Sequence, residues 1–174
     1  MKSDYESRAL KFARILTALF ANCFDLADFE NAIDRYNCTH THTIRYAHGV
    51  SRIAIIRSDY VIKFDYNPAP WWSDGRAGNI ESEARVYAQA VADGMEHLLA
   101  KVTVGEANGR TFAIMPRIMG VGNDERDWQD FCTYAECTWL DRHIRDLHEN
   151  NVGYRNGKVC VIDYAWEEEE EIDW

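Results

Sequence analysis

A polar loop, two short strands and an aspartate lie near the end of the chain, in IRDLHENNVGYRNGKVCVIDY, residues 144–164. Asp146 and Asn151 stand five positions apart, and Asp163 follows the second strand. A carboxylate can orient and deprotonate a hydroxyl group, whereas an amide oxygen and a second carboxylate are ligands that Mg²⁺ accepts. Residues of these types could together act on a hydroxyl group and hold a metal ion.

A lysine inside an apolar strand is the second chemical feature. Lys63 lies in VIKF, a segment that we expect to be central in a sheet. A buried lysine needs a carboxylate partner, because an unpaired charge is costly to remove from water. Glu83, in a helix predicted over residues 80–92, can supply it. Glu81 is the alternative, although it would face a different side of the helix.

The elements that must position these residues follow from hydrophobic periodicity. Short connections between the first three strands predict an antiparallel meander. Asn79 is a suitable cap for the helix after the meander, and Asn108-Gly109 and Asn156-Gly157 predict hairpin turns. The predicted helices cover residues 4–20, 25–36, 80–92 and 126–144, and the predicted strands cover 41–47, 50–57, 59–66, 99–105, 111–118, 151–154 and 158–162.

Composition excludes several classes of function. The chain has 174 residues, 47% of them hydrophobic, which is sufficient for one globular domain with a substantial core. A net charge of −10 disfavours direct binding to nucleic acid and favours basic partners. We expect no membrane span and a cytoplasmic location, because long apolar runs and a signal peptide are both missing from the sequence. The five cysteines and the THTHT histidines have no recognisable disulfide or zinc-ligand spacing.

The terminal pattern R-D-L-H-x-x-N-x-G, followed by V-I-D, resembles the catalytic loop and metal-binding aspartate of the protein-kinase-like superfamily. This resemblance implies ATP and Mg²⁺ as cofactors. It implies that Asp146 is the catalytic base or orienting group and that Asn151 and Asp163 hold metal. His148 stands where the small-molecule branch of the superfamily has a structural histidine, and we expect it to orient the loop by hydrogen bonds.

The order of features further upstream fits the same resemblance. Lys63 corresponds to the catalytic, phosphate-binding lysine, and Glu83 to its ion-pair partner. Gly49 and Ser51 stand where the phosphate-covering loop belongs, and Met115 lies where the chain would meet the adenine edge. The resemblance covers about residues 40–166, and within it the chain looks most like the early protein kinases of short-tailed bacteriophages, which would place it in the host cytoplasm.

The resemblance implies an α+β, protein-kinase-like fold, with a five-stranded antiparallel N-lobe that carries one helix and a truncated helical C-lobe. The corresponding division is an N-terminal helical hairpin over 1–38 that packs on the body, an N-lobe over 39–118, a minimal C-lobe over 119–166 and an acidic tail over 167–174.

The sequence also departs from the family pattern. H-G-V-S-R replaces a full glycine-rich loop, D-Y-A replaces the glycine after the metal aspartate, and Ile144 stands in place of a histidine. Only eleven residues follow Asp163, so we find no activation segment or later supporting helices. We therefore hypothesise that the N-terminal helical hairpin packs under the catalytic loop and supports it.

Three functions are compatible with these features. The first is an ATP- and Mg²⁺-dependent phosphotransferase that acts on Ser or Thr of protein substrates. The second is a catalytically degenerate pseudokinase that binds and inhibits a host or partner protein, with Glu167–Glu171 of the tail as a contact. The third is a small-molecule kinase, which D-L-H-x-x-N suggests.

Overall fold

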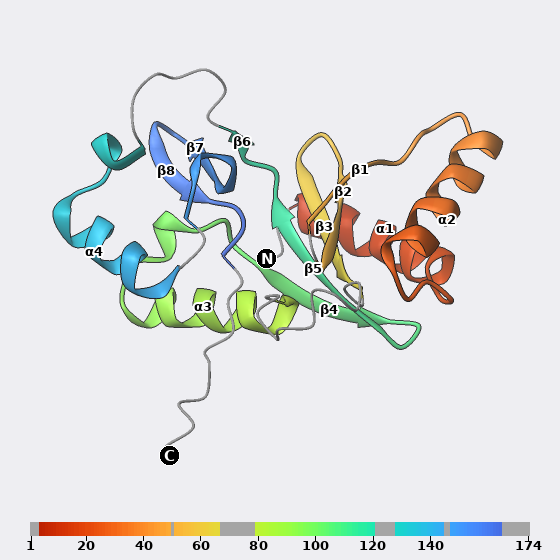
Figure 1. Ribbon diagram of the computed structural model, residues 1–174, viewed down its shortest axis with the longest axis horizontal. Helices are drawn as coiled ribbons and strands as arrows, with labels where there is room; N and C mark the ends of the chain where they lie inside the picture. The colour runs from red at the N-terminus through yellow and green to blue at the C-terminus, as the bar shows by residue number, and fades with distance from the viewer. Residues whose placement is uncertain (1–3, 50, 67–78, 121–127, 145–146, 165–174) are drawn as a thin grey trace, which may run out of the picture.

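The structure is a computed structural model that describes residues 4–49, 51–66, 79–120, 128–144 and 147–164. The expected α+β class is confirmed, with a five-stranded antiparallel sheet and a separate three-stranded sheet (Figure 1). The α-helices are α1 (Asp4–Leu19), α2 (Leu26–Thr39), α3 (Ile80–Ala92) and α4 (Tyr134–His143). The strands are β1 (Arg45–His48), β2 (Arg52–Ile56), β3 (Tyr60–Asp65), β4 (Thr103–Ala107), β5 (Arg110–Pro116), β6 (Met119–Gly120), β7 (Val152–Arg155) and β8 (Lys158–Val161).

The larger sheet places Lys63 at its centre. Its strand order is β1-β2-β3-β5-β4, and Lys63 on β3 pairs with Ala54 of β2 on one side and Ala113 of β5 on the other. Central position agrees with the apolar neighbours of this lysine in the sequence. The β4–β5 connection turns at Asn108 and Gly109, with φ values of 52° and 70°, as the Asn-Gly hairpin signal predicts.

One face of this sheet is covered by the N-terminal helices. Side chains alternate along β3, so Ile62 and Phe64 point to the helices while Val61 and Lys63 point the other way. Phe64 packs against Phe20 with ring centroids 5.2 Å apart, and Phe20 packs against Phe29 at 4.7 Å. This aromatic cluster joins α1 and α2 to the sheet, and Figure 1 shows both helices at one end of the molecule.

The hypothesis that the N-terminal hairpin lies under the catalytic loop is wrong for the described part of that loop, residues 147–151. The helices cover the sheet face opposite to Lys63, because Ile53, Ile55 and Phe64 make that face apolar and it must be shielded from water. An ion pair between Glu6 and Lys101, with 2.7 Å between Oε1 and Nζ, further joins α1 to the residues before β4.

The other face of the sheet is covered by α3 and the three-stranded sheet. Asn79 caps α3 as predicted: its side chain accepts a hydrogen bond from Ser82 N, and the Ser82 hydroxyl accepts one from Asn79 N. Beyond the short turn η2 (Glu96–Leu98), Ala100 N donates to Val161 O at 2.8 Å, which links the strand β8 to the chain after α3. These contacts build a second core cluster.

The predicted helix over 126–144 is wrong at its beginning. Within the described part, a short 3₁₀ turn, η3 (Trp128–Phe131), comes first, and α4 begins after Thr133. Thr133 and Glu136 form a capping box: Thr133 N donates to Glu136 Oε2 at 2.6 Å, and the Thr133 hydroxyl accepts from Glu136 N. Across η3 and α4 the buried residues are Trp139 and Leu140.

Several element boundaries also differ from the prediction. Residues 41–44, predicted as the start of the first strand, are outside any strand, and β1 begins at Arg45. The helix α2 extends to Thr39, and the His40 ring that follows it stacks on Tyr36 with centroids 3.9 Å apart. The β4 strand begins four residues later than predicted, at Thr103. No helix in the described ranges has the length and apolar character needed to cross a membrane.

Candidate functional site

A buried ion pair joins the larger sheet to α3. Lys63 Nζ lies 2.5 Å from Glu83 Oε1, and the two side chains are 8% and 0% exposed. The N-cap at Asn79 fixes where α3 begins, and it thereby turns Glu83 towards the sheet while Glu81 is exposed. Of the two glutamates that the sequence offered as partners, the structure pairs Lys63 with Glu83.

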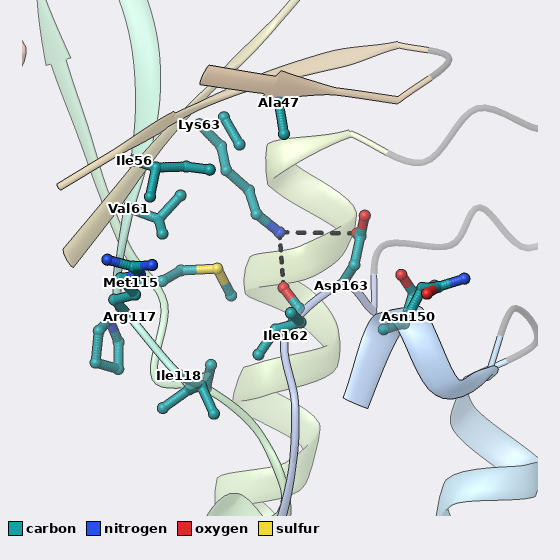
Figure 2. A pocket seen from close by; sticks show the side chains of 14 residues that line it. Ala47, Ile56, Val61, Lys63, Met115, Arg117, Ile118, Asn150, Ile162 and Asp163 are labelled. Atoms are coloured by element: carbon teal, nitrogen blue, oxygen red, sulfur yellow. Dashed lines mark hydrogen bonds and ion pairs between the residues drawn. The ribbon is translucent and has the colours of Figure 1, made fainter. Parts of the chain in front are cut away.

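The end of the β7–β8 hairpin brings Asp163 to the same lysine. Lys63 Nζ donates to the carbonyl oxygen of Ile162 at 2.9 Å, and it lies 3.7 Å from Asp163 Oδ1 (Figure 2). The turn at Asn156 and Gly157, with φ values of 55° and 76°, reverses the chain so that β8 returns towards the sheet. Residues that are 99 and 100 positions from Lys63 in the sequence thus contact one ammonium group.

Arg52 completes this charge cluster, and the sequence did not indicate it. Its NH1 atom lies 3.2 Å from Glu83 Oε1, its NH2 atom donates to Asp163 Oδ1, and its side chain is only 13% exposed. Arg52 is the first residue of β2, and no local motif distinguishes it from the other arginines. Two cations and two carboxylates therefore share one partly buried site.

The charges of this cluster shift the pKa values of Asp163 and Arg52. Burial by itself raises the pKa of Asp163, but the positive charges of Lys63 and Arg52 outweigh burial, and the pKa is below its usual value. Burial lowers the pKa of Arg52, whereas Glu83 and Asp163 more than compensate and the net direction is upward. Asp163 is therefore ionised at neutral pH, which is the form that binds metal.

The cluster forms one end of a cavity of about 330 Å³, which is within the usual range for small-molecule sites. Its wall is apolar at the other end, where Figure 2 shows Ile56, Val61, Met115 and Ile118. Such a cavity can hold an apolar ring at one end and charged groups at the other. The lining residues are Ala47, Ala54, Ile56, Val61, Lys63, Ala100, Met115, Pro116, Arg117, Ile118, Asn150, Asn151, Ile162 and Asp163.

Asn151 reaches the cavity from the 3₁₀ turn η4 (Glu149–Asn151). His148 caps this turn: its Nδ1 accepts a hydrogen bond from Asn150 N at 3.2 Å, and its Nε2 lies 3.0 Å from Asn151 Nδ2. Asn151 O accepts from Ile162 N at 2.8 Å, which connects the turn to the residue before Asp163. The contacts of His148 agree with its expected role in orienting the loop.

The remaining predicted residues differ in where they lie. Met115 lines the cavity and is 2% exposed. Gly49 and Ser51 are not among the lining residues; instead the Tyr66 hydroxyl donates to Gly49 O, and Tyr66 N donates to Ser51 O at 2.8 Å. Asp146 lies outside the described residues.

The side-chain oxygen atoms on the cavity wall are suitable ligands for a magnesium ion that also binds phosphate. Mg²⁺ usually takes one or two protein oxygen ligands and completes its octahedron with water and phosphate oxygens. Asp163 and Asn151 provide this kind of set. In the described ranges there is no cluster of three or more His, Cys, Asp or Glu residues that could enclose a metal ion by itself.

Comparisons with known proteins add little to this geometry. No family model matches the chain. No curated protein matches it either. A co-crystal structure of WbdD with the kinase inhibitor LY294002 is similar to 71% of this chain, with a TM-score of 0.40 and 16% sequence identity, and the match covers 32% of the WbdD chain. Similarity this distant carries no weight for function.

Proposed function

We propose that this protein binds ATP with Mg²⁺ in the cavity and transfers a phosphoryl group from it, as a compact enzyme of the protein-kinase-like type. One observation carries the proposal: the buried Lys63–Glu83 pair lies beside Asp163, with 3.7 Å between Lys63 Nζ and Asp163 Oδ1, at the charged end of a cavity of about 330 Å³. Such a group of charges at a concave apolar site is a typical setting for an active site.

Lys63 is proposed to bind the phosphates of the nucleotide. An ammonium group has three donors, and in this structure it uses two of them on Glu83 Oε1 and Ile162 O. Among the described residues its other contact is the longer one to Asp163 at 3.7 Å, which leaves a third donor for a phosphate oxygen. Glu83 holds the Lys63 ammonium group in place through the hydrogen bond that its Oε1 accepts. The apolar wall around Met115 would receive the adenine ring.

Asp163 and Asn151 are proposed to hold the metal, which when bound would neutralise the charge that develops on the phosphates. Asp146 is proposed to orient the acceptor hydroxyl, an assignment that rests on its five-residue spacing from Asn151. Ser or Thr of a protein is the proposed acceptor, and the net charge of −10 favours a basic one. The likeness to early phage kinases, with a host protein as substrate, is part of the same proposal.

A nucleotide-binding protein without transferase activity is the second candidate. Gly49 and Ser51 favour it, because neither residue is among those that line the cavity and Gly49 N already donates to Arg52 O at 2.9 Å. Fewer backbone N–H groups would then contact the phosphates than in a glycine-rich loop. A protein of this kind would act by binding a partner.

Phosphate transfer from labelled ATP to basic Ser/Thr peptides would test the proposal, with Lys63→Met, Asp163→Asn and Glu81→Gln compared with the unchanged protein. We expect the first two variants to lose on the order of a hundredfold or more in rate, because each removes charge stabilisation at the phosphates. Glu81→Gln is the control, since Glu81 is exposed on the same helix turn. Nucleotide binding without transfer would support the second candidate, and absence of both would contradict the proposal.

A further inference from the structure

Arg52 is placed behind Asp163 and outside the cavity. Asp163 and Lys63 line the cavity wall, whereas Arg52 is not among the lining residues and its NH1 atom is inaccessible to solvent. Its guanidinium group spans the two carboxylates: NH1 lies 3.2 Å from Glu83 Oε1, and NH2 donates to Asp163 Oδ1. A side chain in this position reaches the cavity only through Asp163.

The two carboxylate oxygen atoms of Asp163 have different contacts. Both cations meet Oδ1, since Arg52 NH2 donates to it and Lys63 Nζ lies 3.7 Å away. Within the described part of the chain, these are the ion pairs of this carboxylate, and they leave Oδ2 available to a ligand. The side chain is 42% exposed although Arg52 behind it is 13% exposed, so the open side of Asp163 is the side away from Arg52.

The backbone around Asp163 is fixed on both sides. Ile162 N donates to Asn151 O at 2.8 Å, and Ile162 O accepts from Lys63 Nζ at 2.9 Å. On the other side Tyr164 is 1% exposed, and its hydroxyl group donates to Ala100 O at 2.6 Å. Rotation of the Asp163 side chain is therefore the principal freedom left at this position, and the contact with Arg52 restricts it.

We propose that Arg52 is a positioning residue that holds Asp163 by Oδ1, leaves Oδ2 available to a metal ion in the cavity, and links Asp163 to Glu83 on the same face of the sheet. This inference rests on the proposed function. A guanidinium group suits this task because its rigid planar fork can bind two carboxylates at once, and a lysine ammonium lacks that fork.

Two other roles for Arg52 would have different effects on nucleotide and metal binding. As a phosphate ligand it would contribute to nucleotide affinity even without metal, and as a competitor of the metal its removal would tighten metal binding. Its position behind Asp163, away from the cavity wall, disfavours both roles. Partners that orient a metal ligand typically contribute a factor of about 10–100 in metal affinity.

The experiment titrates Mn²⁺ into the full chain saturated with a non-hydrolysable ATP analogue, and it follows free Mn²⁺ by electron paramagnetic resonance. Arg52→Gln should raise the Mn²⁺ dissociation constant by about tenfold or more. Arg52→Lys should recover part of the loss, because it restores the charge without the fork. Arg45→Gln is the matched control, since Arg45 is an exposed arginine on the neighbouring strand β1. Affinity for the analogue in EDTA should change less than about twofold in all three variants.

Unchanged Mn²⁺ affinity in Arg52→Gln would overturn the inference, as would tighter Mn²⁺ binding or a loss of analogue affinity in EDTA equal to the loss of Mn²⁺ affinity. If Arg52→Gln does not fold, Arg52→Lys decides the matter, and Mn²⁺ affinity equal to that of the unchanged protein would contradict the positioning role. Failure of the unchanged protein to bind the analogue at all would instead refute the proposed function and the inference together.

Discussion

The two faces of the five-stranded sheet are built from one set of strands but have opposite character. On the face that α1 and α2 cover, Phe64 and its neighbours form a closed aromatic core. On the other face Lys63, the next residue along β3, belongs to a cluster of four charges at the edge of a cavity. Because successive side chains of a strand point to opposite faces, the residues that pack the core and the residues that line the charged cavity alternate along β3. Substitutions at neighbouring positions should therefore affect stability on one face and ligand binding on the other.

Truncation of Phe64 should destabilise the fold by disrupting the aromatic core. Phe64→Ala removes a ring that is 0% exposed and should lower the free energy of unfolding by about 3–5 kcal/mol. Val61→Ala, on the cavity face of the same strand, should cost about 1 kcal/mol, because Val61 is only half-buried. Urea unfolding of both variants measures the difference, and equal losses would contradict the separation of the two faces.

A methyl group at Gly105 should reveal how tightly the aromatic face is packed. A Cβ at this position would lie 2.7 Å from the Phe112 ring, so Gly105→Ala should destabilise the fold by about 1–3 kcal/mol. At Gly49 a Cβ would meet no atom within 4 Å, and Gly49→Ala should change stability by less than about 0.5 kcal/mol. Thermal melting separates the two variants. A large loss for Gly49→Ala would show that this turn is under a constraint that its backbone contacts do not explain.

Removal of the lysine charge should weaken ligand binding on the cavity face while the fold remains stable. Lys63→Met should weaken binding of an ATP analogue by about tenfold, or about 1.4 kcal/mol, because the phosphates lose a charged donor. Arg52 would remain beside Glu83, with NH1 3.2 Å from Oε1, so the glutamate keeps a cation and the fold should persist. Fluorescence titration and circular dichroism check the two parts. Unchanged affinity in a folded variant would remove Lys63 from the site.

Substitution of Glu136 should have the smallest effect on stability, and that effect should depend on pH. Hydrogen bonds from the backbone of Thr133 and from His97 lower the pKa of Glu136 to about 2, from 4.5. The ionised form therefore stabilises the fold above about pH 4.5, and this contribution is lost as the pH falls towards 2.

Between pH 7 and pH 3 the unchanged protein should lose about 1 kcal/mol more stability than Glu136→Gln, which keeps the shape of the capping box without the charge. Urea unfolding at the two pH values measures this difference. Identical losses in both proteins would show that Glu136 does not contribute through its charge.

Local signals in the sequence predicted local structure well. Asn79 caps α3, and the Asn108-Gly109 and Asn156-Gly157 turns have the expected positive φ values, since each depends on only a few adjacent residues. The pairing of Lys63 with Glu83 could also be predicted from the sequence, because a buried strand lysine requires an acidic partner and the next helix offers one.

Other features depend on contacts that no local pattern encodes. Arg52 lies 111 residues from Asp163 in the sequence, and nothing near it indicates that pairing. The strands are apolar on both faces, so the pattern alone did not show which face the N-terminal helices cover. The apolar spacing across 126–144 predicts a longer helix than the structure has, because the Thr133–Glu136 capping box within that range begins α4.

Calorimetric titration of a non-hydrolysable ATP analogue, with and without Mg²⁺, tests the central claim most directly. It would compare the unchanged protein with Asp163→Asn and the exposed control Glu81→Gln. The account predicts binding that Mg²⁺ strengthens in the unchanged protein and in Glu81→Gln, and it predicts that Asp163→Asn loses the Mg²⁺-dependent part. Absence of binding at millimolar analogue, or binding whose Mg²⁺ dependence survives in Asp163→Asn, would contradict it.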